Sequence, residues 1–298
     1  MDTRRLEDLL ASRLMCFAAI LSGLIVFVII IVLLGKSIPI LKIQPIDELL
    51  FSSSWYPLKG QFGFYPFIIG TVWVTGLAMI LAIPPSLMMS IYVSEYAPTK
   101  IRGIIKPMVD LLAGIPSVVY GLWGVLFLVP LIRDDLAPMV GVTTTGYTVL
   151  SGSIVLAIMV FPTIIAISDE VLRASPQEAR QASMALGATK WQTVKHVVIR
   201  STLPGIVAAV ILGFGRAFGE TMAVLMVVGN VPKVPNSIFD PAYPLTALIA
   251  NNYGEMMSIP LYESGLMFSA LLLMVTVVLF NIIAGIMFTG IRRRYILG

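Results

Sequence analysis

The sequence has almost no cysteine or histidine: its 298 residues include only Cys16 and His196. One cysteine cannot form an internal disulfide, and one residue of each kind is too few for a cysteine- or histidine-based metal cluster. No Ser/His/Asp arrangement stands out either. We therefore assign no catalytic residue and no metal ligand, and we expect His196 to be a solvated or interface residue.

Charged residues are also scarce. They make up 12% of the chain, against about 25% in a typical soluble domain. Hydrophobic residues make up 58%, and the mean hydropathy is +0.94. A chain of this composition has too little polar surface to cover itself in water. The composition therefore predicts an integral membrane protein.

Long apolar runs are what the sequence has in abundance. Six of them exceed about 18 residues, the length that crosses roughly 30 Å of hydrocarbon as a helix. They occupy 14–34, 67–93, 108–132, 149–167, 206–228 and 265–289. The first exceeds the apolar core of a signal peptide, about 7–15 residues, so we expect it to remain as a span. The predicted fold class is all-α, a polytopic membrane protein with six transmembrane helices. The alternative is a re-entrant segment in place of the second run, which Pro84 and Pro85 interrupt.

The basic residues outside these runs predict the orientation. Fourteen of the 20 Lys and Arg lie before the first run, between the second and third, between the fourth and fifth, and after the sixth. Five lie in the other connections, and Arg216 lies within a run. Because cytoplasmic loops carry the excess of Lys and Arg, both termini are predicted to face the cytoplasm.

The segment between the fourth and fifth runs carries helix-start patterns. Residues 175–178, SPQE, predict an N-cap at Ser175, a proline at the first helical position and a capping-box Glu178. This helix should end near Gly187, a residue that easily takes the left-handed conformation. Residues 189–192, TKWQ, repeat the capping pattern. We expect two short helices joined at an elbow, either an ordinary interfacial pair or a socket for a partner that transmits force.

The elbow resembles the EAA loop of ABC-importer membrane subunits. Gln181-Ala182-Ser183, three residues and Gly187 follow the pattern Glu-Ala-Ala-x-x-x-Gly, with departures at Gln181 and Ser183. The later Ile-x-Leu-Pro positions hold Val197, Ile199 and Arg200. Two further strings, GIPSVVYG at 114–121 and FGETMAV at 218–224, are similar to the PstC family of phosphate-importer permeases. The resemblance extends from about Phe67 to the C-terminus.

The resemblance implies a MetI-like fold and a subunit of an ATP-driven, high-affinity phosphate importer in the plasma or inner membrane. Residues 67–298 would form the permease core with a coupling loop at about 169–203, preceded in 1–66 by an amphipathic stretch, the first span and an extracytoplasmic loop. The partners implied are a PstA-like permease, two PstB-like ATPases and a PstS-like phosphate-binding protein outside. ATP and Mg would bind the ATPases, with no cofactor in this chain. The residues implied in ATPase coupling are Glu178, Gln181, Ala182, Ser183 and Gly187.

A polar pathway is predicted by the residues themselves. Arg216 lies about ten residues into the fifth run, near the bilayer midplane at 1.5 Å per residue. An arginine there costs about 2.5–3.5 kcal/mol on insertion scales, so it should face a bundle interior, a cavity or a partner charge. Glu220, one helical turn onward, makes a structural ion pair one interpretation; contact of Arg216 with a passing oxyanion is the other. Further pathway candidates are the hydroxyls of Ser117, Tyr120 and Thr221.

Prolines in the runs leave a choice between helix breaks and kinks. They are Pro84 and Pro85, Pro116 after Gly114, and Pro162. Freed backbone groups at membrane depth are tolerated where they are buried or line a cavity.

Two nucleotide-binding patterns fail. Gly35-Lys36-Ser37 resembles the end of a P-loop, but Ile30 stands where its first glycine is needed, so we expect no ATPase in this chain. Gly215 and Gly219 lie in an apolar run and indicate helix packing. Two rival functions remain: a permease for another oxyanion, such as tungstate or phosphonate, and a self-sufficient channel or secondary transporter.

Overall fold

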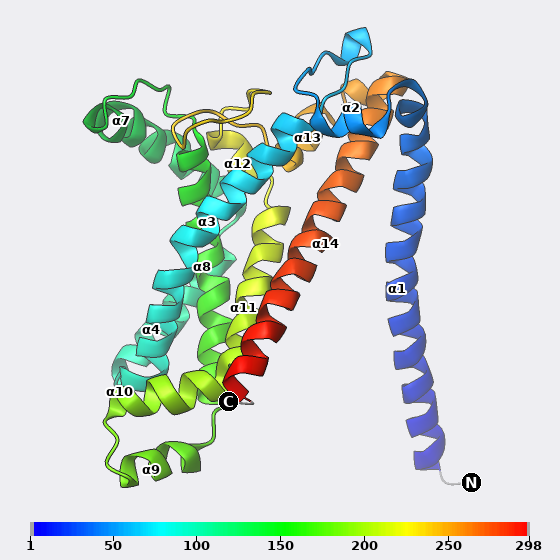
Figure 1. Cartoon of the computed structure of the whole chain (residues 1–298). Coiled ribbons are helices and arrows are strands. Elements are labelled where there is room, and N and C mark those ends of the chain that lie inside the picture. Colours follow the sequence, from blue (N-terminus) through cyan, green and yellow to red (C-terminus); the bar gives the residue numbers. More distant parts are fainter. Residues whose placement is uncertain (1–2, 297–298) are drawn as a thin grey trace.

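The computed structural model describes residues 3–296, with side chains described for residues 10–286. The chain forms a bundle of long helices with short helical segments at both ends (Figure 1). The elements are α1 (Thr3–Ile43), α2 (Ile46–Phe51), η1 (Pro57–Lys59), α3 (Tyr65–Ile91), η2 (Tyr92–Tyr96), α4 (Thr99–Gly114), α5 (Ser117–Trp123), η3 (Gly124–Leu128), α6 (Val129–Leu131), η4 (Ile132–Leu136), α7 (Ala137–Met139), α8 (Val149–Arg173), α9 (Gln177–Ala185), α10 (Lys190–Thr193), η5 (Val194–Val198), α11 (Ile199–Gly219), α12 (Met222–Val227), α13 (Leu245–Asn252), η6 (Met256–Ser258) and α14 (Pro260–Ile296).

Six helical stretches in the described chain are long and apolar enough to cross a membrane, which confirms the predicted number. They are Leu10–Ile43, Tyr65–Tyr96, Ser117–Met139, Val149–Arg173, Lys190–Gly219 and Pro260–Ile286. The second stretch passes through Pro84 and Pro85 as one helix, so the re-entrant alternative is wrong. Pro162 likewise lies inside the continuous helix α8. Neither proline site is a break.

The core lies where α3, α8 and α11 pack together. Val74 and Ala78 on α3 meet Leu156 and Val160 on α8 and Val210 on α11, and these side chains are almost fully buried. Ala78 is small enough to allow the helices to approach closely, and dense apolar packing is what stabilises contacts between spans. A hydroxyl from α8 reinforces the α3 contact: Ser153 Oγ donates to the carbonyl of Val74 over 3.1 Å.

An aromatic cluster closes the end of the bundle opposite α9. The Trp55 ring lies 5.7 Å from Phe62, 5.4 Å from Phe64 and 4.7 Å from Phe67, with tilted or edge-on planes. Such edge-to-face pairs add roughly 0.5–1.5 kcal/mol each beyond the area they bury. The cluster fixes the loop after α1 onto the starts of α3 and α14.

Helix α1 stands apart from the rest of the bundle along most of its length (Figure 1). No residue in its most apolar window is buried within this chain. Helix α1 contacts α14 near the C-terminal end of α1. There the Ile40 N–H donates to Ser264 Oγ over 3.1 Å, and Lys36 pairs with Glu263 at 2.9 Å. Residues 35–37 thus lie inside helix α1, and Lys36 is paired with Glu263, so this segment forms no phosphate-binding loop.

The described ends of α1 and α14 lie at the same end of the bundle as α9 and α10 (Figure 1). This agrees with an even number of crossings. Several arginines counted for the orientation lie outside the described side chains: Arg4, Arg5, Arg292, Arg293 and Arg294. Which end faces the cytoplasm, and the division of the chain at Phe67, stay predictions.

Candidate coupling elbow and substrate pathway

The elbow forms as two helices around a left-handed turn. Helix α9 is followed by Gly187 at φ +87°, which confirms the predicted helix end. Thr189 and Gln192 form the predicted capping box of α10, with bonds of 3.3 and 2.8 Å. The predicted N-cap at Ser175 is wrong: Pro176 holds that position with no side-chain bond. The Ser175 hydroxyl instead lies 3.3 Å from Ser201 Oγ on α11, a contact that no local pattern encodes.

The second elbow helix is not an isolated element. α10, η5 and α11 follow one another without a gap, so the elbow leads directly into the fifth span. In Figure 1 the α10 part lies across the end of the bundle while α11 rises through it. Ser183 Oγ on α9 lies 3.0 Å from Thr193 Oγ1 at the end of α10 and joins the two arms of the elbow.

The outward surface of the elbow is apolar as well as basic. Leu186 is 89% exposed, and Met184 and Trp191 are about half exposed at 48% and 54%. Glu178, Gln181, Ala182 and Gly187 are exposed as well, whereas Ser183 is half-buried toward α10. Exposed large apolar side chains around a polar stretch are typical of a docking surface. Four of the five predicted coupling residues therefore lie where a partner can reach them.

The third predicted run, 108–132, is broken at Ile115 and Pro116, and the third span begins just after the break. Helix α4 ends at Gly114, Ile115 is extended at φ −69° and ψ 128°, and α5 begins at Ser117. A proline disfavours helical geometry in the residue before it, which explains the break. The Tyr120 hydroxyl donates to the carbonyl of Leu112 over 2.8 Å and so satisfies a group that the break frees. Pro116 thus marks a break and not a kink, and the third span lies at Ser117–Met139 instead of the expected 108–132. Tyr120 is buried and is largely a packing residue.

A second break, absent from the sequence prediction, divides the fifth predicted run, 206–228, and ends the fifth span at Gly219. Helix α11 ends at Gly219, Glu220 is extended at φ −73° and ψ 128°, and α12 begins at Met222. Oε1 of Glu220 accepts the N–H of Thr221 at 3.2 Å and that of Ala223 at 3.5 Å. The carboxylate therefore lies at the start of α12, where the helix dipole favours a negative charge.

This break contradicts the structural ion pair of Arg216 with Glu220. The two residues share no helical face, and the described ion pairs do not include them. Arg216 instead lies in the last turn of α11 and donates from Nη1 to Thr163 Oγ1 on α8 over 2.8 Å. Its side chain is exposed within this chain. Each charge thus complements the nearer helix end, and the other guanidinium N–H groups remain available.

Helices α5 and α12, which follow the two breaks, pack against each other. Gly121 on α5 faces α12 so closely that an added Cβ would lie 3.1 Å from Ala223 Cα and 2.6 Å from Met226 Sδ. The breaks therefore belong to one region of the bundle. Ser117 begins α5 and is half-buried, and the Thr221 hydroxyl bonds the Gly219 carbonyl at 3.3 Å.

Three polar contacts around the elbow and the breaks were not foreseen. Thr163 binds Arg216, and the Thr246 hydroxyl on α13 donates to the Glu220 carbonyl over 3.1 Å. Glu95 binds Arg180 across 85 positions of sequence. No local pattern marks these partners, although a hydroxyl or carboxylate close to an apolar run is a weak indication. Among the described residues, no group of three or more His, Cys, Asp or Glu side chains is arranged to hold a metal ion.

Comparison with known proteins assigns this architecture to a family. Residues 82–297 match the model of the "Binding-protein-dependent transport system inner membrane component" family. The chain belongs to this family. The predicted resemblance to ABC-importer membrane subunits is thereby confirmed, and the match includes the elbow and both helix breaks.

Curated relatives of this importer permease cover nearly its whole length. It is 38% identical over 260 residues to the "Probable ABC transporter permease protein YqgH" of Bacillus subtilis (strain 168), covering 85% of this chain and 82% of the relative. It is 31% identical over 303 residues to the "Phosphate transport system permease protein PstC" of Haemophilus influenzae (strain ATCC 51907 / DSM 11121 / KW20 / Rd), covering 97% and 95%. The relatives are permease proteins, as the sequence predicted.

Solved structures share the fold of this permease. A chain of the inward-facing MetNI methionine ABC transporter superposes with a TM-score of 0.58 at 18% identity, covering 80% of this chain and 99% of that one. A chain of a bacterial alginate ABC transporter in complex with its pentasaccharide-bound periplasmic protein gives 0.59 at 16% identity, covering 93% and 96%. The MetI-like fold predicted from the sequence is confirmed.

Proposed function

We propose that this permease forms half of the translocation pathway of an ATP-driven, high-affinity importer of inorganic phosphate. The observation that carries the proposal is Arg216, which presents an exposed guanidinium beside the helix break that ends the fifth span. A guanidinium fork matches two oxygens of a phosphate. Relatives named as phosphate permeases over most of this chain support phosphate as the oxyanion.

Glu220 gives the pathway a means of selecting its anion. Its Oε1 is engaged at the start of α12, whereas Oε2 has no hydrogen bond from the described residues. That oxygen can accept a hydrogen bond from the hydroxyl of hydrogen phosphate. Fully ionised sulfate has no such hydroxyl and would meet only repulsion.

The proposed assembly pairs this chain with a PstA-like permease, two PstB-like ATPases and a PstS-like binding protein. ATP and Mg bind in the ATPases, so this chain performs no hydrolysis and holds no cofactor. The exposed apolar side chains of the elbow support an ATPase contact on that surface. When the ATPases close, they move the elbow, and α11 transmits the movement to the second break because it continues the elbow helix.

The test is transport by the complete complex in proteoliposomes, with binding protein outside and ATP inside. We expect uptake of labelled phosphate that requires the ATPases and is not inhibited by sulfate at equal concentration. Uptake without the ATPase subunits would indicate a channel or secondary transporter. Preferential uptake of tungstate or a phosphonate would assign the pathway to another oxyanion.

Orientation is tested by labelling single cysteines in intact cells after Cys16→Ser removes the native thiol. Lys100, in the first turn of α4, and Asn236, beyond α12, are both exposed and lie in segments predicted to face opposite sides. We expect a membrane-impermeant maleimide to label Asn236→Cys and not Lys100→Cys, because the basic connections face the cytoplasm. Equal labelling of both would overturn the predicted topology.

A further inference from the structure

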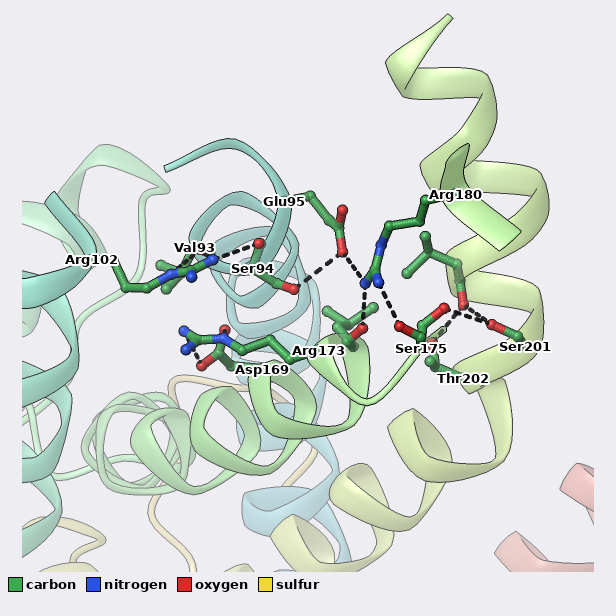
Figure 2. A network of polar contacts seen from close by, with 12 residues as sticks. Val93, Ser94, Glu95, Arg102, Asp169, Arg173, Ser175, Arg180, Ser201 and Thr202 are labelled. Carbon is green, nitrogen blue, oxygen red and sulfur yellow. Dashed lines mark hydrogen bonds and ion pairs between the residues drawn. The ribbon is translucent and has the colours of Figure 1, made fainter. Parts of the chain in front are cut away.

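A cluster of charged side chains joins the elbow to the second span. Figure 2 shows Arg180, from α9, between Glu95 of the π-helical segment η2 and the end of α8. Arg180 Nη2 lies 2.8 Å from Glu95 Oε1. The two side chains are only 17% and 9% exposed, so the pair is largely shielded from water.

Arg180 also binds the backbone at the end of α8. It donates to the carbonyl of Leu172 over 2.8 Å and to that of Ser175. These carbonyls lie at or just beyond the helix end, where intrahelical partners run out and a positive charge is favoured. One guanidinium thus links α9, the end of α8 and η2.

The link matters because α9 has little other attachment to the bundle. None of its residues is buried. Its other side-chain bond to a neighbouring element is the Ser183–Thr193 hydroxyl pair, which stays within the elbow. The second arm of the elbow reaches the same segment, since Lys190 Nζ lies 4.7 Å from the centre of the Tyr96 ring. Both arms therefore meet η2 at consecutive residues.

From η2 the contacts continue to the third span. Arg102, in the first half of α4, donates to the carbonyls of Val93 and Ser94 at 3.0 and 2.6 Å (Figure 2). Helix α4 then leads to the break at Ile115 and Pro116. A continuous series of ion pairs and charge-assisted bonds thus runs from the elbow to α4, the helix that precedes the third span.

We infer that the Arg180–Glu95 ion pair is a force-transmitting clasp. It makes η2 and α4 follow the elbow, so that one ATPase stroke reaches both helix breaks. The stroke reaches the break at Glu220 through α11 and the break at Ile115 through the clasp and α4. Arg180 and Glu95 are positioning residues that touch no substrate. The inference rests on the proposed ATP-driven import and adds the route by which the stroke reaches the third span.

The test compares phosphate uptake per ATP hydrolysed in the reconstituted complete transporter. Glu95→Gln keeps a hydrogen-bond acceptor and removes the charge, and we expect it to lower this ratio about 5- to 30-fold. Glu95→Asp keeps the charge and loses reach, so it serves as a milder second variant with a smaller loss. Adding Glu95→Gln to Arg180→Gln should cause no further loss, because both changes open the same contact.

The matched control is Asp169→Asn. Asp169 forms an ion pair of 2.6 Å with Arg173 beside the clasp, but both residues lie on α8 and the pair joins no second element (Figure 2). We expect this variant to keep the ratio within about twofold. The clasp would be overturned if both Glu95 variants kept the wild-type ratio of phosphate uptake to ATP hydrolysed. It would also be overturned if the losses from Glu95→Gln and Arg180→Gln added up in the double mutant. If the wild-type complex itself shows no phosphate-stimulated ATP hydrolysis, the proposed function fails instead.

Discussion

Replacing Arg216 with glutamine is expected to reduce phosphate uptake about 10- to 100-fold, since a hydrogen bond to a charged group contributes about 1.5–3 kcal/mol. The guanidinium is exposed, has one described partner and lies next to a helix break. We therefore expect the loss without reduced abundance of the subunit in the membrane. Uptake of labelled phosphate, normalised to abundance by immunoblot, is the measurement.

Three companion variants separate a pathway role from a structural one. Thr163→Val removes the described partner of Arg216 and should reduce uptake no more than about fivefold. Arg216→Lys keeps the charge without the fork and should stay well below wild type. Because Glu220 is not paired with Arg216, the double variant with Glu220→Gln should transport no better than Arg216→Gln alone. Recovery in the double variant, or a Thr163→Val loss equal to that of Arg216→Gln, would leave a structural role.

Replacing Gly187 with valine is expected to uncouple the transporter. Gly187 has φ +87°, and an added Cβ would meet nothing within 4 Å in this chain, so any effect that arises within this chain comes from the backbone conformation. Forcing a β-branched residue into this region costs about 1–3 kcal/mol, which would move the turn that joins α9 to α10. We expect phosphate-stimulated ATP hydrolysis to fall about tenfold while the subunit still inserts.

The control for this change is Gly187→Asn at the same position. Asparagine is similar in volume to valine but tolerates the left-handed region, so we expect the Gly187→Asn variant to hydrolyse ATP at close to the wild-type rate. Equal losses for asparagine and valine would mean that a side chain at this position blocks a partner. Normal stimulation with valine would show that the turn does not carry the stroke.

The sequence predicts those features whose causes are local. Span number follows from runs of apolar residues, and the elbow follows from Thr189, Gln192 and Gly187, which act on their nearest neighbours. The break at Pro116 belongs to the same class, because a proline restricts the residue before it.

The errors arise where distant residues compete with local patterns. Ser175 does not cap α9 because Ser201 on α11 takes its hydroxyl. The break at Glu220 contains no proline, and its freed groups find partners in the Glu220 side chain and in Thr246 on α13. The Glu95–Arg180 clasp joins residues 85 positions apart. Such contacts follow from the assembled bundle and have no periodicity of their own.

The detachment of α1 bears on how the sequence can change over evolutionary time. Along most of its length within this chain, α1 exposes interchangeable Ile, Val, Leu and Phe side chains, and its buried contacts gather near Ile40. Within this chain, the exposed length of α1 is therefore constrained only by its total hydropathy and its length. Many sequences meet both requirements.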